Sequence, residues 1–312
     1  MARIIEDAMV ETVSQALLGA INCDGGPTEE QTAVLRAIIS GYWGRTDIDV
    51  ATLTPLSAKQ AGAAITRPDQ RRRTREFMVL LELCRHPLTA TQVDRVEDYC
   101  TELGEAEADA GLEVTRDLVR DGIEVAMTDY LRFFEEVASE VSEPTLKEFD
   151  GSDESRADLV KQLRAYEDLP AGTLGYEFLE FHRTNNLPLP GEDDDHPAVF
   201  LAHDMNHLIG GYGTSGQEEI ALGAMLLGIN DSDAHWINFI GNLAVHEAGF
   251  LSSEELVSKT STLGREGAAE LLAEAFRRGS ECTGDFSIAD HLALASTPLS
   301  EVQASFGVPS RV

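Results

Sequence analysis

The chain has 312 residues, and 43% of them are hydrophobic, which is ample for a folded core and argues against global disorder. Its 55 acidic residues outnumber its 24 basic residues and give a formal charge of −31. A surface of this sign repels nucleic-acid phosphates and anionic lipid headgroups, so we expect no nucleic-acid partner. The length predicts two domains or one large one.

No segment of the sequence has the features of a secretion signal or a membrane span. The N-terminus carries acids instead of a basic start and an apolar run, and the strongest apolar stretch, 220–229, is too short to cross a bilayer. The four cysteines form no C-x-x-C pair and are expected to be reduced. We therefore expect a cytoplasmic protein without a transmembrane segment, and a location at the membrane periphery stays open.

Helical periodicity dominates the first half of the chain. Apolar residues recur every three to four positions in 4–21, and breaks rich in glycine and proline separate the helical segments. No stretch in either half shows the alternation of a strand, so the predicted fold class is all-α. The helices expected in this half span 4–21, 28–39, 77–84, 89–99 and 107–141.

Two of these helices begin with the same signal. Thr28 is followed three residues later by Gln31, and Thr89 by Gln92, a spacing typical of a capping box at a helix N-terminus. The apolar segments that precede them, each ending in a cysteine, are also alike. We interpret this pattern as a duplicated helical hairpin.

The acidic turn after the first helix carries a family resemblance. The pairs Asp24-Gly25 and Glu29-Glu30 follow an apolar helix, and residues 5–105 resemble the TerB-like (tellurite-resistance) helical domain. The resemblance implies a small acidic helical domain, and some members are proposed to hold a metal through the acidic turn. In this chain we expect the acids to serve the turn and the positive end of the next helix, with a metal site as the alternative.

A polar, turn-rich segment separates the two halves. Residues 142–157 are poor in apolar side chains and are predicted to be an acidic linker. The expected organisation is thus two helical domains, 1–141 and 158–312. Within the second domain we expect helices at 158–166 and 176–182 and a proline-rich loop at 185–197.

The most informative motif is His203-Asp204-Met205-Asn206-His207, followed by Glu219. Two histidines four residues apart lie on one face of a helix, and imidazole and carboxylate are ligands for zinc, iron or manganese. The glycine-rich segment 210–216 predicts a tight turn that returns Glu219 to the same face. A phosphate nest is the alternative for the glycines, and surface histidines are the alternative for the pair. We therefore predict a helix, a turn and a second helix whose side chains bind one divalent metal ion.

The same motif is similar to the H-D-x-x-H-(eleven)-E signature of the coenzyme Q biosynthesis protein 4 family. Further stretches match the family in the same order, namely 169–181, 210–222, 275–279 and 298–308. The resemblance therefore covers about 165–310. The resemblance implies a mostly helical fold and a divalent metal held by His203, Asp204, His207 and Glu219, where the spacing favours Glu219 over its neighbour Glu218. It implies zinc or iron as the cofactor, with manganese or magnesium as further candidates.

The resemblance also implies a role in ubiquinone-type or specialised quinone biosynthesis. The expected substrate is a hydrophobic, prenylated benzoate- or phenol-like molecule, and the expected reaction is oxidative decarboxylation by a metal-dependent decarboxylase or hydroxylase. The alternative is a non-catalytic, metal-stabilised lipid-binding scaffold for biosynthetic enzyme partners. A homo-oligomer is compatible with either role.

An enzyme would need a general acid or base near the metal. His246 and Glu247, on an apolar helix predicted at 239–250, are the first candidates, and His235 beside Trp236 is the next. The alternative for His246 is a histidine that packs in the core.

Overall fold

The computed structural model describes residues 3–104, 152–193, 196–249 and 261–311. Within these residues the chain forms helices joined by turns and has no sheet. The β-type pairing in this part of the chain is one isolated antiparallel bridge between Thr173 and Pro298. The all-α prediction is confirmed. None of the helices in this part of the chain combines the length and apolar composition needed to cross a bilayer.

Parts of the predicted organisation fall outside the described residues. The helix expected at 107–141 lies there, and so do residues 142–151 of the expected linker. Linker residues 153–157 are helical, because Ser152 accepts a hydrogen bond from the backbone N–H of Ser155 and caps a helix that begins at Asp153. The division into two domains therefore stays a prediction.

The N-terminal helices follow the expected order, with some boundaries shifted. The fourth helix begins well before the predicted residue 77, because its first half buries the polar side chains of Gln70, Arg73 and Thr74, which no apolar pattern reveals. The elements are α1 (Asp7–Ile21), α2 (Glu29–Ala37), η1 (Ile38–Tyr42), η2 (Val50–Thr52), α3 (Ala58–Ala64), α4 (Pro68–Leu83) and α5 (Ala90–Leu103).

The two predicted hairpins, α1–α2 and α4–α5, exchange equivalent hydrogen bonds. Both cap threonines accept a hydrogen bond from the backbone N–H of the glutamine three residues on, as the sequence predicts. Nε2 of Gln31 then donates to the Leu81 carbonyl over 3.0 Å, and Nε2 of Gln92 donates to the Ala20 carbonyl over 3.0 Å. Each carbonyl lies three residues before the cysteine that ends its segment. This reciprocity supports the predicted duplication.

The second half is also helical, but two predicted helices begin at the wrong residue. The helix expected at 158–166 begins at Asp153 and ends at Arg164. The helix expected at 239–250 begins at Asp233, because Ser232 caps its start, and ends at His246. The elements are α8 (Asp153–Arg164), η4 (Ala165–Asp168), α9 (Leu174–Asn185), α10 (Phe200–Gly210), α11 (Gly216–Ile229), α12 (Asp233–His246), α13 (Ala268–Glu281), η5 (Phe286–Ile288), α14 (His291–Leu294) and α15 (Leu299–Ser305).

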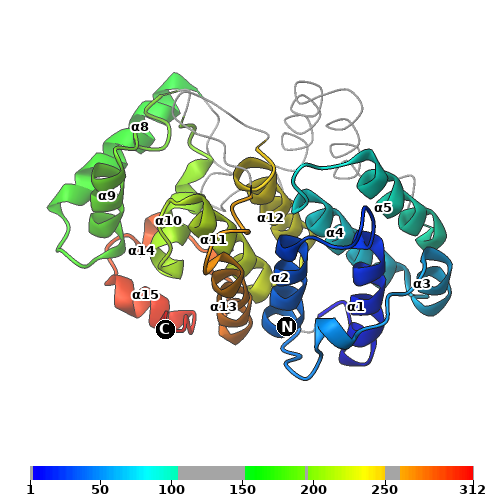
Figure 1. Ribbon diagram of the computed structural model, residues 1–312. Helices are drawn as coiled ribbons and strands as arrows, with labels where there is room; N and C mark the ends of the chain where they lie inside the picture. Colours follow the sequence, from blue (N-terminus) through cyan, green and yellow to red (C-terminus); the bar gives the residue numbers. More distant parts are fainter. Residues whose placement is uncertain (1–2, 105–151, 194–195, 250–260, 312) are drawn as a thin grey trace.

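Helix α11 forms the centre of the molecule. All of its residues from Glu219 to Ile229 are buried, which is typical of a helix surrounded by other elements. It crosses α13 at glycines: a Cβ on Gly279 would lie 2.1 Å from the Met225 carbonyl oxygen. The two backbones therefore touch. Figure 1 shows α11, α12 and α13 between α1–α5 on one side and α8–α10 on the other.

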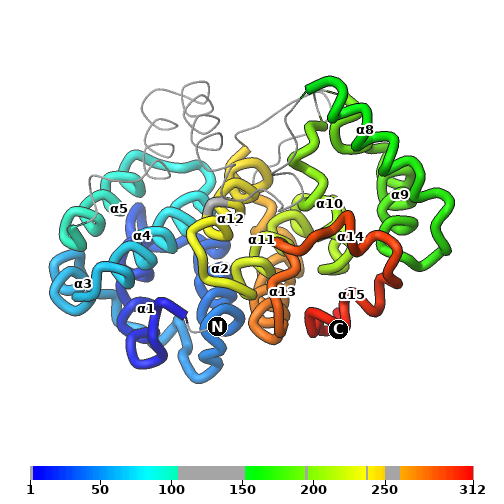
Figure 2. The backbone as a smooth tube through the Cα atoms, turned by 180° about the vertical axis from the view of Figure 1, so that it is seen from behind, coloured from blue at the N-terminus to red at the C-terminus, as the bar shows by residue number. Residues whose placement is uncertain are grey.

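Both halves of the chain contribute to one hydrophobic core. The ring of Phe77 on α4 meets the ring of Trp236 on α12 edge to face at 4.7 Å between centroids. Beside them Arg73 forms a buried ion pair with Asp231 over 2.8 Å. The view from behind in Figure 2 shows α12 next to α4 and α13 next to α2. The central helices therefore pack against the N-terminal hairpins.

Candidate metal centre

The side chains of the motif on α10 diverge as a regular helix requires. Residues four apart share a face, whereas neighbours in sequence point about 100° apart. His203 and His207 accordingly face the start of α11, and Asp204 faces α9 and the loop that precedes α10. One helix thus contributes side chains to two different clusters.

The first group, which we call the His203 cluster, consists of His203, His207 and Glu219. The two Nε2 atoms lie 3.0 Å apart, and each lies 3.2 Å from Oε2 of Glu219. The side chain of His203 is 24% exposed, whereas that of His207 is 1% exposed. Three donor atoms thus form a nearly equilateral triangle that is open on the His203 side.

Local structure fixes these three side chains. Gly211 ends α10 with φ of 74°, which makes the turn expected from the glycines, and Glu219 follows in the first turn of α11. An acid there is favoured by the positive end of the helix dipole. Nδ1 of His207 lies 3.3 Å from the Tyr212 carbonyl, and donation to that oxygen leaves Nε2 free to bind a cation.

The charges of the His203 cluster favour an ionised carboxylate. Burial alone would raise the pKa of Glu219, but the imidazoles of His207 and His203 hold it well below its usual range. Burial would lower the pKa of His203, yet the hydrogen bond and charge of Glu219 raise it. The cluster therefore stabilises positive charge between its three donor atoms.

Asp204 belongs to a second group, which we call the Asp204 cluster, together with His182 and His196. Its Oδ2 lies 2.9 Å from Nε2 of His196 and 3.3 Å from Nε2 of His182. The structure thus separates Asp204 from the three donor atoms that converge beside it. Metal binding by the four motif residues stays a prediction.

Glu247 belongs to a third group, the Glu247 cluster, with Glu30 and His86. Its Oε1 lies 2.5 Å from Nε2 of His86, and its Oε2 accepts a hydrogen bond from the backbone N–H of Leu263 over 2.8 Å. Glu30 lies in the first turn of α2 and His86 follows α4, so this cluster joins the N-terminal hairpins to the end of α12. The structure does not bring Glu247 to the His203 cluster, and its catalytic role stays a prediction.

The other predicted histidines also lie outside the His203 cluster. His246 lies beside the start of α11, where its Nδ1 is 3.6 Å from the place of a Cβ on Gly216. His235 forms a buried ion pair with Asp285 over 3.3 Å. Within the glycine turn, the backbone of Gly213 hydrogen-bonds to the carboxylate of Glu218, so a protein anion occupies this part of the suggested phosphate nest.

Sequence reasoning did not find His182, His196 or His86 as members of clusters. The available signal was composition: the chain has eight histidines, and these three together with His203 and His207 account for five of them. Their partners come from other helices and loops, so spacing along the chain gives no sign of the pairing.

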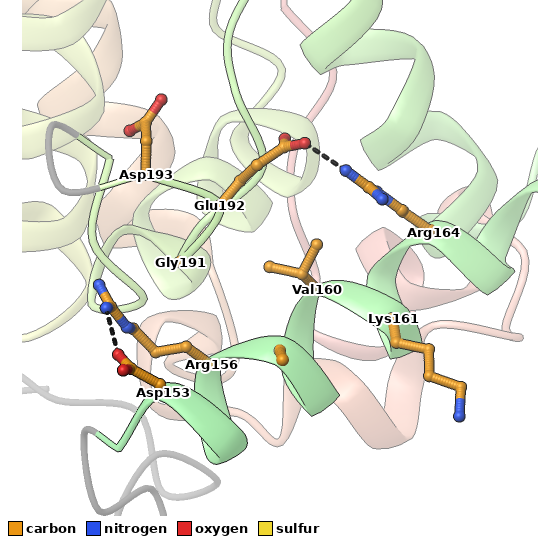
Figure 3. A pocket seen from close by; sticks show the side chains of 9 residues that line it. Asp153, Arg156, Val160, Lys161, Arg164, Gly191, Glu192 and Asp193 are labelled. Atoms are coloured by element: carbon orange, nitrogen blue, oxygen red, sulfur yellow. Dashed lines mark hydrogen bonds and ion pairs between the residues drawn. The ribbon is translucent and has the colours of Figure 1, made fainter.

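A surface pocket of about 680 Å³ has a lining that differs from all three clusters (Figure 3). It lies between α8 and the loop at 191–193, and an ion pair between Arg164 and Glu192 joins these two walls. Arg156 also lines it and pairs with Asp153 over 2.7 Å. This charged lining does not suit the prenyl tail expected from the sequence.

No protein-family model and no curated protein matches the chain. Among solved structures, the chain is similar to a protein from Nostoc punctiforme PCC 73102 that is proposed to be a ubiquinone biosynthesis protein. The similarity covers 76% of this chain and 99% of that chain, with 17% sequence identity and a TM-score of 0.37.

Proposed function

We propose that the chain binds a divalent transition-metal ion through the His203 cluster and acts on a hydrophobic benzoate- or phenol-like compound of ubiquinone-type metabolism. Oxidative decarboxylation is the reaction that the family resemblance suggests. The substrate class comes from the resemblance of residues 165–310, and the metal comes from the geometry of the cluster. The observation that carries the proposal is the triangle of donor atoms formed by His203, His207 and Glu219.

The donor set fits a transition-metal ion in chemistry and in spacing. Imidazole nitrogen and carboxylate oxygen are common ligands of zinc and of non-haem iron. Donors that each lie 2.0–2.2 Å from one ion at tetrahedral or right angles are about 2.8–3.6 Å apart. The separations of 3.0 Å and 3.2 Å between the three donor atoms fall in this range.

Each side chain has a distinct task in this proposal. A bound divalent ion supplies Lewis acidity toward a phenolate or carboxylate oxygen. His207 is fully buried and held by the Tyr212 carbonyl, so it fixes the position of the centre. Glu219 supplies the negative charge, and the exposed edge of His203 gives a ligand access.

Two aromatic rings flank the cluster and suit an aromatic substrate. The ring of Phe181 stacks on His207 with 5.5 Å between centroids and an angle of 25°. The ring of Phe200 lies 6.1 Å from His203 in an edge arrangement. Both phenylalanines are only partly buried, and Phe200 places apolar surface beside His203 on the open side of the cluster.

The burial of the cluster favours a second candidate, a non-catalytic scaffold with a structural ion. Glu219 is 9% exposed and His207 is 1% exposed, which leaves His203 as the accessible ligand. A structural ion is closed by protein ligands, whereas a catalytic ion keeps an exchangeable position. Access to the ion by a small ligand therefore distinguishes the two functions.

Cobalt-substituted protein tests this access. Purified chain is stripped with a chelator, loaded with Co²⁺ and titrated with 4-hydroxybenzoates that carry alkyl tails of increasing length. The proposal expects the cobalt absorption to change and the affinity to increase with tail length. A change in absorption that disappears in His203→Asn but persists in His235→Asn assigns the ligand to this cluster.

Two results would contradict the proposed activity. A cobalt spectrum that is indifferent to every benzoate and phenol would favour the scaffold. A cobalt content per chain and a cobalt spectrum that are both the same in His203→Asn as in the wild type would place the responding ion elsewhere. Mass spectrometry of lipids that co-purify with the chain identifies the substrate class independently of the metal.

A further inference from the structure

We propose that the Asp204 cluster is a second divalent-metal site, which takes a zinc-like ion through Nε2 of His182, Nε2 of His196 and Oδ2 of Asp204. The three donor atoms lie within 4.8 Å of one another. They share no side chain with the His203 cluster, so this site does not depend on the proposed function.

The hydrogen bonding of His182 leaves a bare nitrogen inside the cluster. His182 is 2% exposed, and its Nδ1 lies 2.8 Å from the Pro188 carbonyl, to which it donates. Among the residues that the structure describes, its buried Nε2 has no hydrogen-bond partner. A neutral imidazole that donates from Nδ1 presents a lone pair at Nε2. This lone pair lies 3.3 Å from Oδ2 of Asp204, a carboxylate oxygen.

Two acceptors at this separation repel each other unless a cation lies between them. Asp204 is 3% exposed, so water does not screen the repulsion, and a buried polar atom without a partner is costly. His196 supplies a further imidazole nitrogen 2.9 Å from the same oxygen. Two imidazoles and a carboxylate form a donor set that zinc prefers. A metal ion satisfies all three groups at once, whereas a proton on His182 satisfies only one contact.

The residues around the Asp204 cluster exclude solvent on the side of His182 and leave the side of His196 partly exposed. The ring of Phe178 lies 4.4 Å from that of His182, and the ring of Phe200 stacks on His196 at 5.1 Å. The side chain of His196 is 14% exposed and comes from the loop before α10. An ion therefore has an entry path past His196, and the buried imidazole and carboxylate supply the more rigid part of the site.

Metal counting in paired variants tests the second site. The chain is stripped with a chelator, saturated with Zn²⁺, passed over a desalting column and analysed for metal per chain. His182→Asn keeps a donor for the Pro188 carbonyl but loses the Nε2 ligand, and it is combined with His196→Asn. We expect this double variant to hold one ion fewer than the wild type. His235→Asn is the matched control, because it alters a buried histidine–aspartate pair to which the described part of the chain brings no second imidazole.

The outcomes separate the two metal sites. The double variant His203→Asn/His207→Asn should also lose one ion, and the quadruple variant should lose two. If His182→Asn/His196→Asn holds as many ions as the wild type, the second site is wrong. If only that variant loses an ion, the second site stands and the His203 cluster is not a metal centre.

Two further measurements keep the inference testable if the double variant does not fold. His196→Gln changes only the exposed edge of the site and should weaken binding of one ion by about tenfold or more. Nitrogen-15 NMR of the zinc-loaded chain should show His182 protonated at Nδ1 only. An imidazolium signal for His182, protonated at both nitrogens, would overturn the proposal.

Discussion

Nε2 of His203 lies 3.0 Å from Nε2 of His207. At this distance two imidazole lone pairs repel each other, so a proton or a metal ion must lie between them. The carboxylate of Glu219, 3.2 Å from both nitrogens, supplies the opposite charge. The relationship follows from the four-residue spacing on α10 and from the turn that brings the start of α11 alongside.

Metal binding should depend on Glu219 and not on its neighbour in sequence. We expect Glu219→Gln to lower the affinity of the His203 cluster for zinc by about 10-fold to 100-fold or more, because the one carboxylate ligand is lost. Glu218→Gln is the matched control, since its carboxylate faces Arg311 at 3.0 Å and Ser215 at 3.0 Å. Competition titration with a zinc chelator measures both. Equal affinities in the two variants would contradict the assignment.

Glu30 should make stability depend on pH. Burial raises the pKa of Glu30 to about 8, and the neighbouring carboxyl of Glu247 adds to the effect. Because the folded pKa exceeds the unfolded value of 4.5, the contribution is fully present below about pH 4.5 and is lost as the pH rises through about 8. Glu30→Gln cannot ionise. We expect it to match the wild type near pH 5 and to exceed it at pH 8 by about 1–3 kcal/mol, allowing for partial exposure.

Urea unfolding at pH 5 and pH 8, with chelator present, measures the effect of Glu30. Glu29→Gln is the control, because Glu29 begins the same helix and is exposed. A Glu30→Gln variant whose difference from the wild type is the same at both pH values would show that Glu30 ionises normally in the fold.

Two adjacent arginines on α4 should differ sharply in their contribution to stability. Arg73 is fully buried and pairs with Asp231, which is also buried. Its replacement by alanine leaves that carboxylate without its charge partner and should cost about 3–5 kcal/mol. Arg72 pairs with Asp233 at the surface, and Arg72→Ala should cost less than about 1 kcal/mol. Chemical denaturation compares them, and similar losses would argue against a tight junction between α4 and α12.

The crossing of α11 and α13 should tolerate no side chain at Gly279. A Cβ there would lie 2.1 Å from the Met225 carbonyl oxygen and 2.9 Å from the Cα of Gly228. Both are backbone atoms and cannot rotate away, so Gly279→Ala should cost about 1–3 kcal/mol or more. Ser280→Ala, at the next and exposed position of α13, should be nearly neutral. Thermal unfolding of both variants measures the difference, and equal midpoints would refute the close crossing.

The sequence was sufficient for features that depend on local spacing. The His203 and His207 pair, the glycine turn and the return of Glu219 all arise within seventeen residues of chain. Helix caps such as Thr28 and Thr89 are equally local, because a hydroxyl and an amide three residues apart decide them. These features could be predicted with no knowledge of the tertiary structure.

Features that depend on packing could not be predicted from the sequence. Asp204 follows His203 in sequence, but its partners His182 and His196 come from α9 and a loop. Glu247 meets His86, which is 161 residues away, only because α12 packs against α4. The start of α12 could not be predicted for a related reason, since Asp233 in its first turn pairs with Arg72 and Arg73 of the other half. In each case a partner distant in sequence sets the role of the residue.

Anomalous scattering from crystals of the zinc-loaded chain tests the metal centre most directly. We expect a peak at the zinc edge that lies about 2.0–2.2 Å from Nε2 of His203, Nε2 of His207 and a carboxylate oxygen of Glu219. Crystals that contain zinc by elemental analysis but show no peak between these three side chains would contradict it.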